Sequence, residues 1–248
     1  MKIDWTPVTD ELTLWRQAGL TLPVWWRDDD AIAPTPALEQ LVALSKAVKV
    51  PVHLAVIPKA ATPELAARVA DTDHLIPVVH GWTHRNLAPK TAKKAEFGDT
   101  RDLADVALDV QNGLKHLQSL FGPRLKPMFV PPWNRIAPVH FSALAKAGYT
   151  ALSTYTPRST PFAAPDLQQI NTHLDPINWR AGKTLIAPDQ LVAQLADLLI
   201  DRRTGKTDNN EPLGLLTHHL VHDTDVWEFT RQMLETLTSG PITLYRHP

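Results

Sequence analysis

The chain alternates between short runs of apolar residues and longer segments in which apolar residues recur every three or four positions. Short runs bounded by turn residues are typical of buried strands, and the longer spacing is typical of helices that bury one face. Strands are predicted at 22–26, 52–57, 75–79, 127–130, 150–154, 167–171 and 213–217. Helices are predicted at 9–18, 36–48, 63–71, 100–121, 138–147, 188–203 and 224–238. This alternation indicates an α/β fold built around a parallel sheet.

Residues that favour helix starts agree with these boundaries. Three prolines stand near predicted helix starts, where the missing N–H costs no hydrogen bond: Pro63, Pro138 and Pro188. The longest helix is predicted to begin after Asp99 or Thr100, either of which can cap it. Its apolar residues form one stripe at helical spacing, which indicates packing against the core.

Two segments do not follow the alternating pattern. The stretch 155–187 is irregular and rich in Pro and Thr, and we interpret it as a functional loop rather than a domain boundary. The segment 242–245 is predicted as an extra strand or as a closure at the bottom of the fold. Because no repeat, linker or low-complexity segment interrupts the chain, residues 1–248 are expected to form one catalytic domain.

The composition excludes several functional classes. The 248 residues are 44% hydrophobic and 21% charged, which suits a single α/β barrel. Lys plus Arg is 25 and Asp plus Glu is 26, so the formal net charge is −1 and no nucleic-acid or membrane partner is expected. The chain has no cysteine, which excludes disulfides, thiolate metal sites and cysteine nucleophiles. The N-terminus lacks the apolar core of a signal peptide, so a cytoplasmic location is expected.

Three consecutive carboxylates follow the first predicted strand. Asp28, Asp29 and Asp30 come directly after Trp25-Trp26 and Arg27. Because neighbouring side chains on a strand point to opposite faces, Asp29 and Asp30 can reach one site only if the strand has ended. Like charges this close raise one pKa unless a cation is present. The cluster therefore indicates a cation site, although an acidic turn or a helix cap would give the same pattern.

A pair of histidines follows the third predicted strand. His80 and His84 are four residues apart, and that spacing lets both rings bind one metal through a single helical turn. Two imidazoles and one carboxylate leave positions open for water and substrate, as in a catalytic zinc site. The same ligand set also occurs in non-heme iron oxygenases, which remain an alternative.

A rigid loop follows the fourth predicted strand. Pro131 and Pro132 stiffen it and remove two main-chain donors, so the first available N–H belongs to Trp133. Beside a metal, that N–H could stabilise an oxyanion, and Arg135 could hold a carboxylate in place. A surface loop that ends in a solvated arginine is the alternative interpretation.

Two later segments add candidate residues. Asp175 could orient a histidine or an arginine, and Trp179 could form a wall of the pocket, although the segment could equally be a turn. His218, His219 and His222 follow the last predicted strand, and a histidine there is a natural general acid because its pKa lies near neutrality. We interpret the other six histidines as structural or surface residues: His53, His74, His116, His140, His173 and His247.

Taken together, these motifs resemble the polysaccharide deacetylase family, the NodB-homology carbohydrate esterases. Five motifs match in the family's order: Asp29-Asp30, His80-x-x-x-His84, Pro132-Trp133, Asp175-x-x-Asn178-Trp179 and Leu216-x-His218. Each motif alone is weak, but each follows a predicted strand and together they cover most of the chain. The Arg-x-Asp-Asp, His-Gly-x-x-His and Pro-Pro-Trp-Asn-Arg sequences are similar to a subgroup that often lacks export signals.

The resemblance implies a distorted (β/α)7 barrel and a divalent metal, usually Zn²⁺, held by Asp30, His80 and His84. It implies that Asp29 is the general base and His218 the general acid. The implied reaction is removal of an N-acetyl or similar acyl group from an amino sugar, an oligosaccharide or a related amide. Substrate contacts are expected from four residues: Trp82, Pro132, Trp133 and Trp179.

The chain departs from the family pattern at three places. Arg27-Asp28 replaces the usual Thr-Phe, and Met128-Phe129-Val130 stands where an arginine normally precedes the third-motif proline. Arg27 or Arg135 is expected to supply the missing cation. Asn178 replaces the second aspartate of the fourth motif, so Asp175 is expected to orient His218. These departures also motivate a rival hypothesis, a relative that binds a ligand without catalysis. The choice of His218 over His219, the native metal and the oligomeric state stay open.

Overall fold

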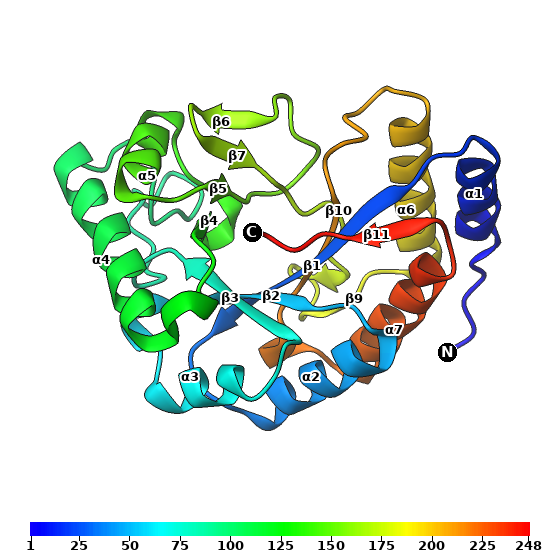
Figure 1. Cartoon of the computed structure of the whole chain (residues 1–248), viewed down its shortest axis with the longest axis horizontal. Helices are drawn as coiled ribbons and strands as arrows, with labels where there is room; N and C mark the ends of the chain where they lie inside the picture. The colour runs from blue at the N-terminus through cyan, green and yellow to red at the C-terminus, as the bar shows by residue number, and fades with distance from the viewer.

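The computed structural model describes residues 1–248 and contains a parallel sheet surrounded by helices (Figure 1). The parallel strands are β1 (Leu22–Ala31), β2 (Val52–Val56), β3 (Leu75–His80), β4 (Met128–Val130), β5 (Ala151–Leu152), β7 (Leu167–Gln169) and β10 (Leu213–Thr217). They lie in the order β10-β1-β2-β3-β4-β5-β7. Beyond β7 the chain reaches β10, because the His173 N–H donates to the Gly214 oxygen (2.7 Å) and the Leu216 N–H to the Leu174 oxygen (2.8 Å). These contacts close the ring, and the expected distorted (β/α)7 barrel is confirmed.

The helices lie on the outside of the strands. They are α1 (Thr6–Gln17), α2 (Pro36–Val48), α3 (Pro63–Ala70), α4 (Leu103–Phe121), α5 (Phe141–Ala147), α6 (Pro188–Arg203) and α7 (Thr224–Thr238). Short 3-10 turns lie at η1 (Pro58–Ala60), η2 (Gly122–Arg124), η3 (Pro132–Asn134), η4 (Pro138–His140) and η5 (His219–Val221). No helix combines the length and the apolar content needed to cross a lipid bilayer.

The start of α4 differs from the prediction. Neither Asp99 nor Thr100 caps this helix. Instead the Asp102 side chain accepts hydrogen bonds from the N–H groups of Ala104 (2.8 Å) and Asp105 (3.3 Å). The helix therefore begins three residues later than predicted, because a nearer carboxylate satisfies its free N–H groups.

Four short strands are not among the seven barrel strands. β6 (Phe162–Ala164) is antiparallel to β7, and β8 (Ile177–Asn178) pairs with β9 (Thr184–Leu185). The stretch 155–187 is thus only partly irregular. β11 (Ile242–Leu244) runs parallel to the first residues of β1, which confirms the extra strand expected near the chain's end.

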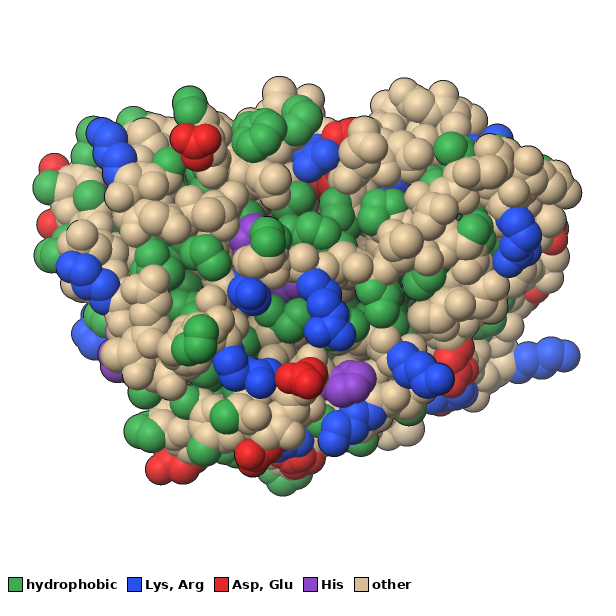
Figure 2. Space-filling view, in the orientation of Figure 1, with side chains coloured by type: hydrophobic (Ala, Val, Ile, Leu, Met, Phe, Trp, Pro, Cys, Tyr) green, Lys and Arg blue, Asp and Glu red, His purple; other side chains and the backbone are tan.

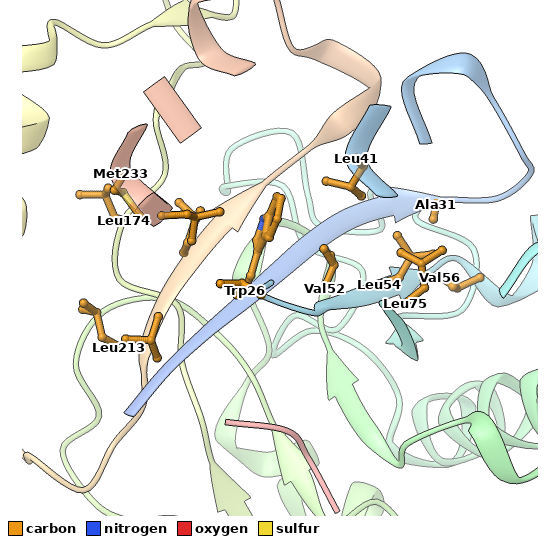
Figure 3. Close-up of a cluster of buried hydrophobic side chains, with 14 of the residues drawn as sticks. Trp26, Ala31, Leu41, Val52, Leu54, Val56, Leu75, Leu174, Leu213 and Met233 are labelled. Atoms are coloured by element: carbon orange, nitrogen blue, oxygen red, sulfur yellow. The ribbon is translucent and has the colours of Figure 1, made fainter. Parts of the chain in front are cut away.

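Side chains of the barrel strands alternate between two apolar layers. A large cluster of 44 buried residues fills the space between strands and helices, and it includes Trp26. Figure 3 shows Trp26 projecting from β1 beside Val52 of β2. A second cluster of seven lies on the opposite strand faces, inside the barrel: Trp25, Ala55, Val78, Met128, Val130, Ala151 and Ile170. Alternation along β1 therefore directs position 27 inward and position 28 outward.

The chain's last residues close the bottom of the barrel. His53 and His247 are both buried, and the His247 N–H donates to His53 Nε2 (3.1 Å). The His247 ring is also within hydrogen-bonding distance of the Thr150 hydroxyl (2.8 Å) and the Tyr245 hydroxyl (2.9 Å). In Figure 1 the C-terminus lies in the middle of the view, and Figure 2 shows Lys and Arg side chains around the middle of the same face. His247 is therefore a structural residue rather than a surface one.

Burial also changes the protonation of these two histidines. Burial lowers the pKa of His53 to about 3 and the pKa of His247 to about 4. An unfolded chain binds protons at its histidines near pH 6.5. Between that pH and about pH 4 the unfolded state therefore binds more protons than the folded state. The free energy of unfolding must fall as the pH falls through this window.

We predict that His53→Gln reduces this acid-side loss of stability. The free energy of unfolding of the variant should depend less on pH between 6 and 4, by up to about 1.4 kcal/mol per pH unit for one proton. Urea unfolding at several pH values measures this slope. His116→Gln, at an exposed position of α4, is the control and should keep the wild-type slope. Equal slopes for wild type and His53→Gln would contradict the assignment.

Candidate active site

β1 continues through the acidic cluster instead of ending before it. Arg27 pairs with Leu216 and Asp28 with Thr217 of β10, and the strand reaches Ala31. The expectation that the strand ends at residue 26 is therefore wrong. The register against β2 shifts between Asp28 and Ala31, and Asp30 has a left-handed φ of +77°. This irregularity, rather than the end of the strand, lets Asp29 and Asp30 face one site.

Asp30, His80 and His84 come together at the ends of β1 and β3. Both Nε2 atoms lie 3.1 Å from Asp30 Oδ1, and one ligand atom from each residue lies within 4.8 Å of the others. Burial opposes ionisation of Asp30, but hydrogen bonds from the two imidazoles hold its pKa well below the usual range. His80 Nδ1 donates to the Val130 oxygen (3.0 Å), so Nε2, the atom that contacts Asp30, is the ring nitrogen that would bind a metal. This donor set fits a divalent metal ion.

The turn between the two histidines is not helical, contrary to the prediction. Gly81 and His84 both have left-handed φ values, +60° and +56°. A Cβ atom at Gly81 would lie 2.4 Å from Glu96 Oε2 and 2.7 Å from the Pro132 ring. Only glycine fits this position, and the close approach brings the turn, the Pro132 loop and Glu96 together.

Arg27 binds Asp29 inside the barrel mouth. Its guanidinium donates two parallel hydrogen bonds to the Asp29 carboxylate (2.9 and 3.0 Å). It also donates to the Ser153 hydroxyl (2.7 Å) and to the side-chain oxygen of Asn134 (2.5 Å). The Arg27 side chain is completely buried, so this is a strong, geometrically fixed ion pair.

Arg135 lies elsewhere. Its side chain is exposed and donates to the main-chain oxygen of Lys94 (2.8 Å). Of the two arginines that the sequence left open, the structure therefore brings Arg27, and not Arg135, to Asp29. Sequence patterns alone missed Ser153 and Asn134, because their role depends on contacts with Arg27 from distant strands.

His218 faces Asp29 across the mouth. Its Nε2 lies 4.0 Å from Asp29 Oδ2, and the Trp179 ring packs edge-on against the imidazole with centroids 4.6 Å apart. Asp175 accepts a hydrogen bond from Trp179 Nε1 (2.8 Å), while His218 Nδ1 is buried without a partner. No hydrogen bond joins Asp175 to His218; Trp179, which donates to Asp175, lies against the His218 ring. Burial raises the pKa of Asp175.

Asp28 and His219 lie on the outer side of β1. Asp28 accepts hydrogen bonds from the Thr217 hydroxyl (2.6 Å), the His219 N–H (3.0 Å) and His219 Nδ1. Burial opposes ionisation of Asp28, but the charge and hydrogen bond of His219 lower its pKa. His219 is thus bound to Asp28, while His218 is the histidine that faces Asp29. Asp28 therefore binds both neighbours of His218 and anchors the main chain on either side of it.

The aromatic residues of the motifs lie in different places. The Trp133 ring packs against His84 with centroids 4.6 Å apart, and Trp179 is 45% exposed. Pro132 is buried under the Gly81 turn. Trp82 packs against the outer core and the ring of His116 on α4.

A hollow of about 520 Å³ adjoins the Arg27 side of the mouth. Its walls include Asn134 and Thr154, which both accept hydrogen bonds from Arg27. Phe141 of α5, Gln169 of β7 and Arg135 are also among its lining residues. The mouth therefore continues into a space with both polar and apolar walls.

Comparison with solved structures finds many proteins whose fold is similar to that of this chain. A proposed polysaccharide deacetylase from Mycobacterium smegmatis has a TM-score of 0.65 at 17% identity, covering 90% of this chain and 86% of that one. A family 4 acetyl xylan esterase from Clostridium thermocellum, in complex with a cobalt ion, has a TM-score of 0.53 at 13% identity, covering 90% and 86%. A family 4 pseudoenzyme from Bacillus anthracis has a TM-score of 0.55 at 13% identity, covering 90% and 64%.

The chain has the fold of the polysaccharide deacetylases. The expected resemblance to this family is thus confirmed at the level of the fold. No protein-family model and no curated protein matches the sequence. At such low identity the comparisons establish the architecture alone.

We predict that Arg27→Gln strongly destabilises the protein, because it leaves the buried Asp29 carboxylate without a counter-charge. The free energy of unfolding should fall by about 3–5 kcal/mol at pH 7, measured by urea unfolding. Arg135→Gln removes an exposed arginine from the same region and should change this value by less than about 0.5 kcal/mol. Equal losses for the two variants would contradict the assignment of the cation to Arg27.

Proposed function

We propose that this protein is a metal-dependent hydrolase that removes an N-acetyl or similar acyl group from an amino sugar, an oligosaccharide or a related amide. The observation that carries the proposal is the convergence of a metal donor set, a carboxylate and an imidazole in one barrel mouth. The donor set is Asp30, His80 and His84, and the other two groups are Asp29 and His218. The fold shared with family 4 carbohydrate esterases supports the same reaction class.

Asp30, His80 and His84 would hold one divalent ion, which we propose to be Zn²⁺ because two imidazoles and one carboxylate form a catalytic zinc set. When bound, the ion supplies Lewis acidity that lowers the pKa of a water molecule and polarises the acyl oxygen. The His80 Nδ1 bond to the Val130 oxygen supports this role, since it fixes the tautomer that presents Nε2. The cobalt ion of the Clostridium thermocellum neighbour supports a metal in this fold.

Two protein groups would move protons during hydrolysis. The Asp29 carboxylate would take a proton from the attacking water as its oxygen bonds to the acyl carbon. His218 Nε2 would give a proton to the amine nitrogen as the C–N bond breaks, which releases the carboxylic acid and the free amine. Their separation of 4.0 Å lets both groups reach one reacting carbon. Arg27 would hold the Asp29 carboxylate in a fixed orientation.

Neighbouring groups would assist the hydrolysis. The Trp133 N–H is proposed to stabilise the tetrahedral oxyanion, since Trp133 lies against His84. Asp175 would hold Trp179, and Trp179 would hold the His218 ring. Pro132 keeps the Trp133 loop rigid beside the site.

The surroundings of the site support a sugar-like substrate. Trp133 and Trp179 offer aromatic faces on two sides of the mouth, and the adjoining hollow of about 520 Å³ has amide and hydroxyl groups on its walls. Such a mixture of flat apolar and polar groups suits a ring that carries hydroxyl groups. No nucleic-acid or membrane surface is part of this proposal.

The metal ligands provide the first test. Asp30→Ala and His84→Ala should lose both the bound metal and acetate release, because each removes one of three protein ligands. Elemental analysis measures the metal, and acetate release from N-acetylated amino sugars and chito-oligosaccharides measures the activity. Full activity of a metal-free preparation would overturn the proposal. Bound iron with oxygen-dependent turnover would instead favour the oxygenase alternative.

The proton-transfer groups provide an independent test. Asp29→Asn and His218→Asn should keep the metal but lower kcat by about 10²–10⁴-fold, the usual contribution of a general acid or base. His219→Asn should act differently: it should mainly lower stability, because His219 binds Asp28 on the outer side. Tight ligand binding without turnover by the wild type would favour a non-catalytic relative, as in the Bacillus anthracis pseudoenzyme.

A further inference from the structure

A buried carboxylate lies behind the turn that carries the two histidines. Glu96 comes from the loop between β3 and α4 and is 0% exposed. Its Oε1 accepts hydrogen bonds from the Thr83 N–H (2.7 Å) and hydroxyl (2.6 Å). Its Oε2 accepts from the N–H groups of Trp82 (3.3 Å) and His84 (3.2 Å). Three successive main-chain N–H groups and one hydroxyl therefore converge on one side chain.

The Glu96 carboxylate is stabilised by these dipoles rather than by a cation. Arg101 of the same loop donates to the main-chain oxygen of Glu96 (2.9 Å) and to the carboxylate of Asp109 (2.8 Å), not to the Glu96 carboxylate. Successive N–H groups that point into one concavity form an anion-binding nest. Both oxygens of the side chain accept hydrogen bonds here, which an ionised carboxylate can satisfy and a carboxamide cannot.

The turn that Glu96 holds is conformationally costly. His84 has a left-handed φ of +56°, a conformation that is disfavoured for a residue with a side chain. In this conformation His84 Nε2 lies 3.1 Å from Asp30 Oδ1. His80 needs no such support, because it is the last residue of β3 and pairs with Val130 of β4. Of the two histidines, His84 is therefore the one whose position depends on Glu96.

We propose that Glu96 is a positioning residue that holds the 81–84 turn in the metal-binding conformation before the metal arrives. The proposal rests on the metal site of the proposed function, but Glu96 itself contacts neither metal nor substrate. Without the carboxylate, the N–H groups of Trp82, Thr83 and His84 lose their acceptor and the turn relaxes. Metal binding must then order His84 again, which weakens the affinity.

Glu96→Gln in the full-length, metal-free protein tests this role. The dissociation constant for Zn²⁺, measured by competition with a chromophoric chelator, should rise about 10–100-fold, the usual effect of losing a group that orients a ligand. Amide hydrogen exchange at residues 82–84 should become faster in the same metal-free variant. Glu96→Asp keeps the negative charge on a shorter side chain and should recover part of the affinity.

Asp109→Asn is the matched control. It removes the partner of Arg101 (2.8 Å) and so loosens the same loop, but it leaves the Glu96 carboxylate on its N–H groups. Its Zn²⁺ affinity should equal that of the wild type. If Glu96→Gln does not fold, Thr83→Val gives the comparison, because it removes only the hydroxyl donor to Oε1 and should weaken Zn²⁺ binding more than Asp109→Asn does.

The outcomes separate this inference from the proposed function. A wild-type protein that binds no divalent metal would overturn both. A wild type that binds Zn²⁺ and hydrolyses its substrate, with Glu96→Gln or Thr83→Val indistinguishable from Asp109→Asn, would overturn the role of Glu96 alone. Weaker Zn²⁺ binding in the Glu96 variant, with wild-type affinity in the Asp109 variant, supports the positioning role over a general effect on the loop.

Discussion

Mutual repulsion among three neighbouring carboxylates at the end of β1 governs the arrangement of the site. Strand alternation sends Asp28 outward and Asp29 inward, and the left-handed φ of Asp30 breaks the alternation. Each carboxylate then meets a different partner: Asp28 binds His219, Asp29 binds Arg27, and Asp30 contacts His80 and His84. Since buried like charges would otherwise oppose ionisation, these separate partners are what allow three carboxylates to share one strand end. His80 and His84 come from the end of β3 and His219 from the end of β10, so these contacts also fix how β1 meets β3 and β10.

Local sequence patterns predict most of the secondary structure because most of it depends on local chemistry. The helices at 36–48, 188–203 and 224–238 have the predicted bounds, and each starts at a proline or after a capping carboxylate or hydroxyl. Strand ends are harder to predict. β1 continues to Ala31 because its charged residues find partners across the barrel. β7 is shorter than expected because the chain then turns toward β10. Such distant contacts cannot be recognised from a short stretch of sequence.

The candidate site shows the same limit. The order of the motifs places the right residues at the right strand ends, and the structure brings Asp29, Asp30, His80, His84 and His218 together there. The direction in which a side chain points cannot be predicted in the same way, because it depends on dihedral angles that the motifs do not specify. Arg135 and Trp82 stand in matching motifs yet point elsewhere. Glu96 and Asp28 support the site, although the motifs assign no role to either. Both are recognisable only from the hydrogen-bond donors that surround them.

The partners of β1 have a consequence for how this chain is made. Arg27 and Asp28 are synthesised early, but Asn134, Ser153 and His219 follow 107, 126 and 191 positions behind the residues they bind. Contacts of such long separation form slowly, and synthesis delivers the N-terminal part first. Until β10 leaves the ribosome, Asp28 lacks its partners Thr217 and His219, and the indole N–H of Trp26 lacks the Thr217 hydroxyl. β1 therefore completes its pairing only when β10 and β11, near the end of the chain, have been made. Until then the nascent chain exposes an apolar segment that a chaperone would be expected to cover.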